Sequence, residues 1–275
     1  MKFKAALAVI GLGVLGAASL PANATFMLTN TAGTFSVDEF DWASNGVAWT
    51  TGFTGVAGSS FTLNYADYAV AVNNLGGTVI DSSQGLDNTA NGVDNGYEYT
   101  IFATLTETIN SCVTNPDLSV TCSFHVTGGF FDIYYDTAAN ANNTLPAWTG
   151  FQDGVDIING TISSSIGGSF TLVGTTGAGG ATLFGTTTGQ NYTYVNPTLG
   201  ATTASTTLQL GAAAGGFVPP VSVDGIILPP GQPVFKGDAN QQFLNAPTVP
   251  EPASLALLGL GLAALTFVTR RRERK

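Results

Sequence analysis

Charged side chains are scarce in this chain of 275 residues, of which they make up only 9%. Long surface helices usually carry many Glu and Lys side chains, so this scarcity disfavours a helical domain. No stretch between the two ends repeats apolar residues at the helical period either. Gly, by contrast, occurs 35 times, which favours strands joined by many turns.

Positive charge is almost absent from the body of the chain. Between residues 25 and 249 there are 16 acidic residues and one basic residue, Lys236, so this segment carries 16 − 1 = 15 net negative charges at neutral pH. Such a body repels phosphate backbones, which argues against nucleic acid as a partner. The same charge keeps a protein soluble outside the cell and attracts divalent cations.

Residues 97–106 give the clearest strand signal, because large apolar side chains alternate there with polar ones. The alternating apolar members are Tyr97, Tyr99, Ile101, Ala103 and Leu105. Further strands are predicted at 61–65, 130–136, 169–173, 206–210 and 234–236. We therefore predict a mainly β domain over residues 25–244, built as an antiparallel β-sandwich or a curled sheet. Residues 174–216 contain few large apolar side chains, so we expect surface loops or short edge strands there.

The N-terminus is typical of a secretory signal peptide. Two lysines precede an apolar run, and Ala22 and Ala24 form an Ala-x-Ala cleavage site. We expect a signal helix within residues 1–24, which signal peptidase removes after Ala24. The chain is then exported, with residues 25–244 outside the cytoplasm.

The C-terminus has three parts in a fixed order. A linker at 245–252 contains Val249, Pro250, Glu251 and Pro252, and an uncharged stretch of 17 residues follows at 253–269. Such a stretch rises about 25 Å as a helix, the lower limit for crossing a membrane, and we expect one transmembrane helix. The basic tail at 270–275 then stays in the cytoplasm by the positive-inside rule. Its arginines are Arg270, Arg271, Arg272 and Arg274.

These three features resemble the PEP-CTERM sorting signal of Gram-negative bacteria. The resemblance covers residues 249–275, from the Pro-Glu-Pro motif to the arginine cluster. It implies that exosortase, a membrane-embedded cysteine transpeptidase, processes the chain near Pro250. The precursor then sits only transiently in the inner membrane, and the mature protein reaches the cell surface or the extracellular matrix. It also implies an association with exopolysaccharide. A permanent membrane anchor is the alternative interpretation.

A second resemblance covers about 35 residues in the middle of the chain. It follows a strand at 128–136, an Asn-rich loop at 140–142, a turn with the sequence TGFQDG at 149–154 and a strand at 157–162. This order is similar to that of a flocculation-associated subgroup of the sorted proteins. It implies a role in floc or biofilm formation and assigns no catalytic residue.

Cys112 and Cys122 are the only cysteines, and a turn signal lies between them. In an exported protein this arrangement predicts a disulfide that closes a hairpin, with two free thiols as the alternative. The only histidine is His125, and no Gly-x-Ser-x-Gly motif accompanies it. We therefore interpret His125 as a strand residue and predict no enzymatic activity.

The segment from Asp87 to Glu98 resembles a calcium loop in its spacing. Asp87, Asn91 and Glu98 occupy loop positions 1, 5 and 12, and a Gly occupies position 6. However, Thr89 is a poor ligand at position 3, and no flanking helices are predicted. The favoured interpretation is an ordinary turn that enters a strand, with no cofactor, and Ca²⁺ remains the alternative. A second acidic group is formed by Asp132, Asp136, Asn140, Asp153 and Asp156.

Three functional hypotheses follow. The first is a non-enzymatic surface or matrix protein that contacts exopolysaccharide or neighbouring cells. The second is a carbohydrate-binding module that uses exposed Trp42, Trp49 or Trp148 rings, although aromatic residues in a β-fold are more often buried in the core. The third is a secreted hydrolase, which requires two carboxylates in one cleft.

Overall fold

The computed structural model describes residues 25–93, 95–163, 167–197, 199, 203–211 and 217–244. These residues are mainly β, as predicted, with one short 3-10 helix, η1 (Ser82–Gln84). The longer strands are β5 (Ser60–Asn74), β7 (Glu98–Thr114), β8 (Val120–Asp136), β10 (Val155–Ile162), β11 (Gly167–Val173), β12 (Thr176–Gln190), β14 (Thr203–Gly211) and β17 (Val234–Leu244). The shorter ones are β1 (Phe26–Asn30), β2 (Gly33–Val37), β3 (Glu39–Trp42), β4 (Gly46–Thr51), β6 (Gly77–Ile80), β9 (Ala147–Trp148), β13 (Val195–Asn196), β15 (Ser222–Val223) and β16 (Ile226–Ile227).

The two predicted terminal helices, at 1–24 and 253–269, lie outside the described residues. Within the part of the chain that is described, no helix is long and apolar enough to cross a membrane. The strands run from Phe26 to Leu244, inside the range predicted for the β domain.

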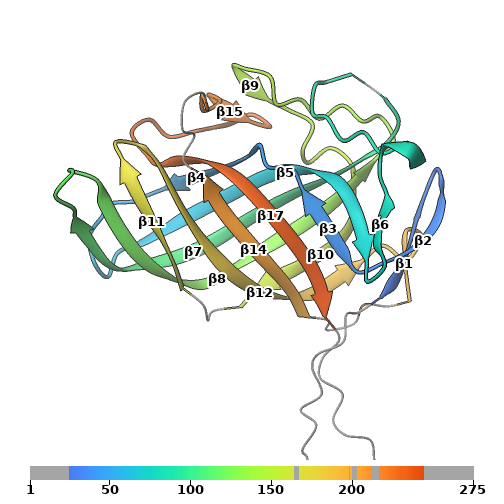
Figure 1. Cartoon of the computed structure of the whole chain (residues 1–275), viewed down its shortest axis with the longest axis horizontal. Coiled ribbons are helices and arrows are strands. Elements are labelled where there is room, and N and C mark those ends of the chain that lie inside the picture. Colours follow the sequence, from blue (N-terminus) through green and yellow to red (C-terminus); the bar gives the residue numbers. More distant parts are fainter. Residues whose placement is uncertain are drawn as a thin grey trace, which may run out of the picture. The chain divides into compact units, whose positions relative to one another are not determined.

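The main sheet closes on itself into an antiparallel barrel of eight strand positions (Figure 1). Around the barrel, β5, β7 and β8 are followed by β10 and β11, which share one position, and then by β12, β14 and β17. β3 and β4 share the last position and return the sheet to β5. The β-sandwich prediction is therefore wrong: the sheet curls until β12 pairs with β14, so one sheet encloses the core.

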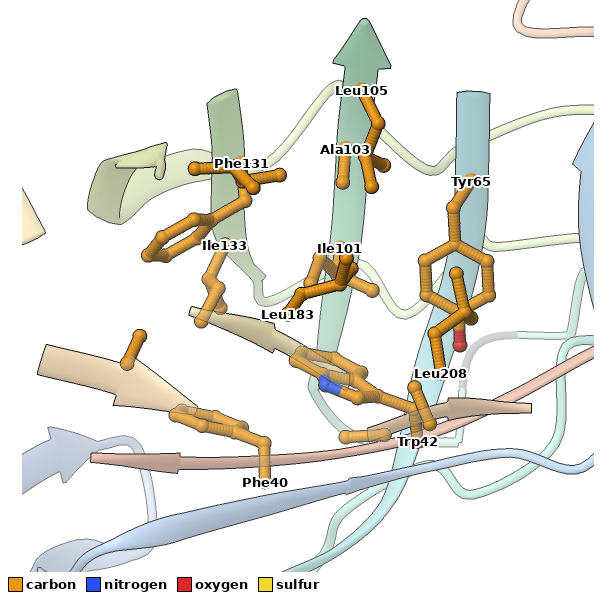
Figure 2. Packing of buried hydrophobic residues seen from close by; sticks show 14 of the residues in the cluster. Phe40, Trp42, Tyr65, Ile101, Ala103, Leu105, Phe131, Ile133, Leu183 and Leu208 are labelled. Carbon is orange, nitrogen blue, oxygen red and sulfur yellow. The ribbon is translucent and has the colours of Figure 1, made fainter. Parts of the chain in front are cut away.

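Alternate residues of each barrel strand point into the barrel, as the pattern at 97–106 predicts. Tyr99, Ile101, Ala103 and Leu105 of β7 are buried in one apolar cluster with residues from the strands across the barrel. Figure 2 shows side chains from β3, β5, β7, β8, β12 and β14 meeting there. At one end of this cluster, the Phe40 and Trp42 rings stack 5.3 Å apart. The barrel interior is thus the main hydrophobic core.

Residues 174–216 contribute two barrel strands, β12 and β14, and not only the loops or edge strands that we expected. The small residues of β12 have a packing reason. A Cβ atom at Gly185 would lie 2.8 Å from the carbonyl oxygen of Thr161 and 3.2 Å from the Phe131 ring, and one at Gly179 would lie 2.6 Å from Cβ of Phe170. Because the bulk comes from these neighbouring strands, β12 carries little of the hydrophobic signal by which strands are recognised.

The barrel interior is filled. A cavity of about 20 Å³ remains near its centre, lined mainly by apolar residues such as Ile101, Phe131 and Leu183. The Oε1 atom of Gln241, also at this cavity, has no hydrogen-bond partner among the described residues. A volume of this size holds about one water molecule. This cavity therefore has no room for an organic ligand.

A second apolar cluster covers part of the outer wall. β9, β15 and β16 form a small sheet, and Figure 1 shows β9 and β15 outside the barrel wall. Trp148, Phe151 and Val223 from this covering layer are buried in a cluster with outward-facing barrel residues. Those barrel residues include Val47, Trp49, Tyr68 and Phe102. The covering layer explains why Phe102 departs from the apolar–polar alternation of its strand.

Glu107 is buried inside the barrel with no partner. Its side chain is 0% exposed, and neither carboxyl oxygen has a hydrogen-bond partner among the described residues. Its neighbours in register are Phe61 of β5 and Val126 of β8, both apolar. Burial alone raises the pKa of Glu107 to about 8. The carboxyl group therefore keeps its proton at neutral pH in the folded protein.

We predict that Glu107→Gln removes a pH-dependent loss of stability. As the pH rises from about 4.5 towards 8, the unfolded chain releases the Glu107 proton while the folded chain keeps it, so wild-type stability falls. Near pH 4, the free energies of unfolding of the variant and the wild type should depend on pH in the same way. At pH 8, the free energy of unfolding of the variant should exceed that of the wild type by at least about 1.4 kcal/mol, the value of one pKa unit. Urea unfolding at several pH values measures this difference. A stability difference that stays constant with pH would contradict the assignment.

Candidate functional site

The two cysteines lie opposite each other near the end of the β7–β8 hairpin. Cys112 and Cys122 are paired in register and form a disulfide, as predicted. His125 is a residue of β8 with an exposed ring, and its Nδ1 atom is 2.6 Å from Oδ1 of Asn110. The disulfide joins β7 and β8, the two longest strands of the barrel, near the end of their hairpin.

The calcium-loop residues make separate contacts with the chain. Asp87 Oδ1 accepts hydrogen bonds from the backbone N–H of Thr89 at 2.9 Å and from its hydroxyl at 2.7 Å. Asn91 Oδ1 accepts one from the N–H of Val93 at 2.8 Å. Glu98 is turned towards a different loop. Across the described stretches, no group of three His, Cys, Asp or Glu residues is arranged to hold a metal ion.

Glu98 holds the covering layer onto the barrel wall. It lies on the outer face of β7, is only 2% exposed, and accepts hydrogen bonds of 3.0 Å from the backbone N–H groups of Asn140 and Ala141. Burial is the main reason why the pKa of Glu98 rises to about 8; Asp136 and Asp153 raise it further, while the N–H donors oppose the rise. A neutral carboxyl group therefore anchors this loop at physiological pH.

Asp224 fixes the other side of the same layer. It precedes Gly225 in the turn between β15 and β16, and it accepts a hydrogen bond from the N–H of Phe151 at 3.1 Å. Sequence reasoning missed this role, although an Asp-Gly pair is a strong hairpin signal. Burial raises the pKa of Asp224.

The second acidic group divides into two parts in space. Asn140 donates a hydrogen bond to Asp153 at 3.2 Å beside the covering layer. Asp132 and Asp156 lie on the neighbouring strands β8 and β10, where burial and the Asp156 charge raise the pKa of Asp132. In addition to burial, Asp136, the last residue of β8, and Asp153 both raise the pKa of Glu98, whereas Asp132 and Asp156 raise the pKa of Tyr134 together with Asp224 of the covering layer.

The three tryptophans are core residues. Trp42 and Trp49 are 1% exposed and Trp148 is 4% exposed, so none of their rings offers a face to a sugar at the surface. The interpretation of these aromatic residues as core is confirmed, and the sugar-binding hypothesis that rested on exposed tryptophans is wrong in that detail.

The two ends of the described chain meet. The ring of Phe26, in the first strand, contacts the ring of Phe243, in the last, with centroids 5.4 Å apart. The sorting residues Val249, Pro250, Glu251 and Pro252, the arginines from 270 and the cleavage-site alanines Ala22 and Ala24 all lie outside the described residues. Their roles stay predictions from the sequence.

We predict that Glu98→Ala destabilises the protein while Glu98→Gln does not. The glutamine keeps a carbonyl oxygen for the N–H groups of Asn140 and Ala141, whereas alanine leaves both unpaired. Ala141 is buried, and an unpaired buried group costs about 1–3 kcal/mol, so the alanine variant should lose at least about 1 kcal/mol of unfolding free energy relative to the glutamine variant. Urea unfolding at pH 6 measures it. Equal stabilities of the two variants would rule out this anchoring role.

Comparison with known proteins identifies the tail. Residues 248–272 match the PEP-CTERM protein-sorting motif, and the match contains the Pro-Glu-Pro sequence and the first arginines of the basic cluster. Comparison with curated proteins and with solved structures finds no match. The motif marks an exported protein that exosortase processes and sorts to the surface. The C-terminal tail of this chain therefore carries the PEP-CTERM sorting signal, as predicted.

Proposed function

We propose that the protein is a non-enzymatic component of the cell surface or extracellular matrix that contributes to cohesion in biofilms or flocs. The sorting motif at 248–272 carries this proposal, because it accounts for export and for delivery of the barrel to the surface. Only five residues, 245–249, separate the last strand from Pro250, and five residues reach at most about 18 Å. A protein processed at the motif keeps a short C-terminal extension and displays a nearly complete barrel.

The filled interior supports a structural role over a hydrolytic one. The central cavity holds no more than about one water molecule, at about 20 Å³. Glu98 and Glu107, two carboxyl groups whose pKa values burial raises to about 8, both lie in buried packing positions. A glycosidase needs two carboxyl groups that face one substrate cleft, and neither of these residues offers one.

The surface charge supports contact with hydrated polymers, directly or through cations. The body carries 16 acidic residues and one basic residue. Those that are exposed, such as Asp153 and Asp156, offer carboxylates to divalent cations that bridge the body to acidic polymers or to other copies. The resemblance of residues 128–162 to the flocculation-associated subgroup favours the same role.

We predict that cell cohesion depends on both the barrel and its sorting. A deletion strain should sediment more slowly than the wild type, and the intact gene should restore it. Replacement of Pro250, Glu251 and Pro252 by alanine should fail to restore it, although the barrel is unchanged. Surface labelling of a tagged copy is the control for delivery. Normal sedimentation of the deletion strain would contradict the cohesive role.

A further inference from the structure

A polar hollow lies on the outside of the barrel where β10 and β12 end. It has a volume of about 560 Å³, is widely open, and is lined by Asp156, Asn159, Gly189, Gln190, Asn191, Tyr192 and Thr193. None of these residues belongs to the core clusters or to the contacts that hold the covering layer. The hollow combines an aromatic ring, a carboxylate, amides and a hydroxyl group at one place.

The base of the hollow is rigid. Asn159 donates a hydrogen bond to Asp156 Oδ2 at 2.8 Å, and its Oδ1 accepts one from the Thr188 hydroxyl at 3.1 Å. Gly189 leaves room for this amide, since a Cβ atom there would lie 2.6 Å from Asn159 Oδ1. The Gln190 amide is held by the carbonyl of Val195 at 3.0 Å. Side chains fixed in this way lose little entropy when a ligand binds.

The rim of the hollow, in contrast, offers free groups. Tyr192 is 66% exposed, and its hydroxyl makes no hydrogen bond to any residue that the structure describes. The turn that carries it is fixed at Asn191, whose N–H donates to Ile157 at 3.0 Å and whose Oδ1 accepts from the Thr193 N–H at 3.0 Å. An exposed aromatic ring on a fixed turn offers its face to a ligand at low cost in conformational entropy.

We propose that this hollow binds a hexose unit of a neutral polysaccharide. The apolar C–H face of a pyranose ring stacks on an aromatic ring such as that of Tyr192. Vicinal hydroxyl groups donate to the Asp156 carboxylate and accept from the Asn191 amide. The hollow is open, which suits one unit of a long polymer better than an enclosed small molecule.

The charge around the hollow selects for a neutral sugar. Asp132 is paired in register with Asn159 of the hollow, and burial and the Asp156 charge raise the pKa of Asp132. Like charges there would repel a uronate or sulfate group. The only Lys or Arg side chain in the described part of the chain is Lys236 on β17, a strand that pairs with β3, β4 and β14 and not with β10 or β12. The hollow thus lacks a cation that would hold an acidic sugar.

Sugar binding at the hollow gives the proposed function a ligand class, and the biological setting of this binding rests on the proposed function. Its own test is a binding measurement on the purified full-length protein, so the two can fail separately. Sugar binding without an effect on cohesion would overturn the proposed function alone. Cohesion without binding to neutral sugars would overturn only the proposal that the hollow binds a sugar.

The test is calorimetric titration with neutral gluco-, manno- and galacto-oligosaccharides and with an oligomer of uronic acids. At least one neutral series should bind, and the uronic acid oligomer should bind at least about tenfold more weakly, the equivalent of about 1.4 kcal/mol. Tyr192→Ala should weaken binding by about tenfold or more, whereas Tyr192→Phe, which keeps the ring, should stay within about threefold of the wild type. Asp156→Asn should relax the discrimination against the uronic acids.

Gln209→Ala, on the outer face of β14, is the matched control and should bind as the wild type does. Circular dichroism checks that each variant is folded. The proposal is overturned if no neutral series binds, if Tyr192→Ala binds as tightly as the wild type, or if the uronic acid oligomer binds as well as the neutral ones.

Discussion

The pairing of β12 with β14 is the interaction on which the rest of the structure depends. It runs through eight residue pairs, from Gly179 opposite Leu210 to Thr186 opposite Thr203, and it joins the two ends of the curled sheet. Without it, the sheet would have two long free edges, and the aromatic side chains inside would face water. Within the curled sheet, a small residue is required where a ring such as Phe131 lies against a neighbouring strand, as at Gly160 of β10.

Because the interior is filled, the outside of the barrel is where this protein can meet other molecules. The covering layer occupies part of the wall and is held by Glu98 and Asp224 from two sides. The hollow around Tyr192 lies on another part, over the ends of β10 and β12. The contact between Phe26 and Phe243 places both ends of the described chain together.

The sequence predicts individual strands and turns better than it predicts the closure of the sheet into a barrel. The alternation in β7, which only Phe102 interrupts, identifies a strand and its inward face, and the positions of Cys112 and Cys122 around a turn predict their disulfide. Alternation marks one buried face in a sandwich and in a barrel alike, so it does not separate the two. The prediction at 206–210 found part of β14, but β12 escapes recognition because Gly and Thr replace the large residues that mark strands, for a reason that lies in bulky residues of the neighbouring strands.

The sequence likewise reveals some of the candidate sites and misses others. The sorting tail is readable because its three features are contiguous in the sequence. The spacing of Asp87, Asn91 and Glu98 suggests one loop, but β7 begins at Glu98 and turns this carboxyl group towards Asn140. Glu107 continues the inward face of β7, yet a carboxylate at such a position is usually taken as exposed. Only the register with Phe61 and Val126 reveals its burial.

The central claim is that this barrel is exported, released from its terminal segments and delivered to the surface. Intact-mass analysis of the protein recovered from the cell surface and the medium tests it most directly. The account predicts a species that begins at Thr25 and ends near Val249, without the basic tail. A mature protein that still carries Arg270 to Lys275 would contradict it and would make the chain a permanently anchored membrane protein.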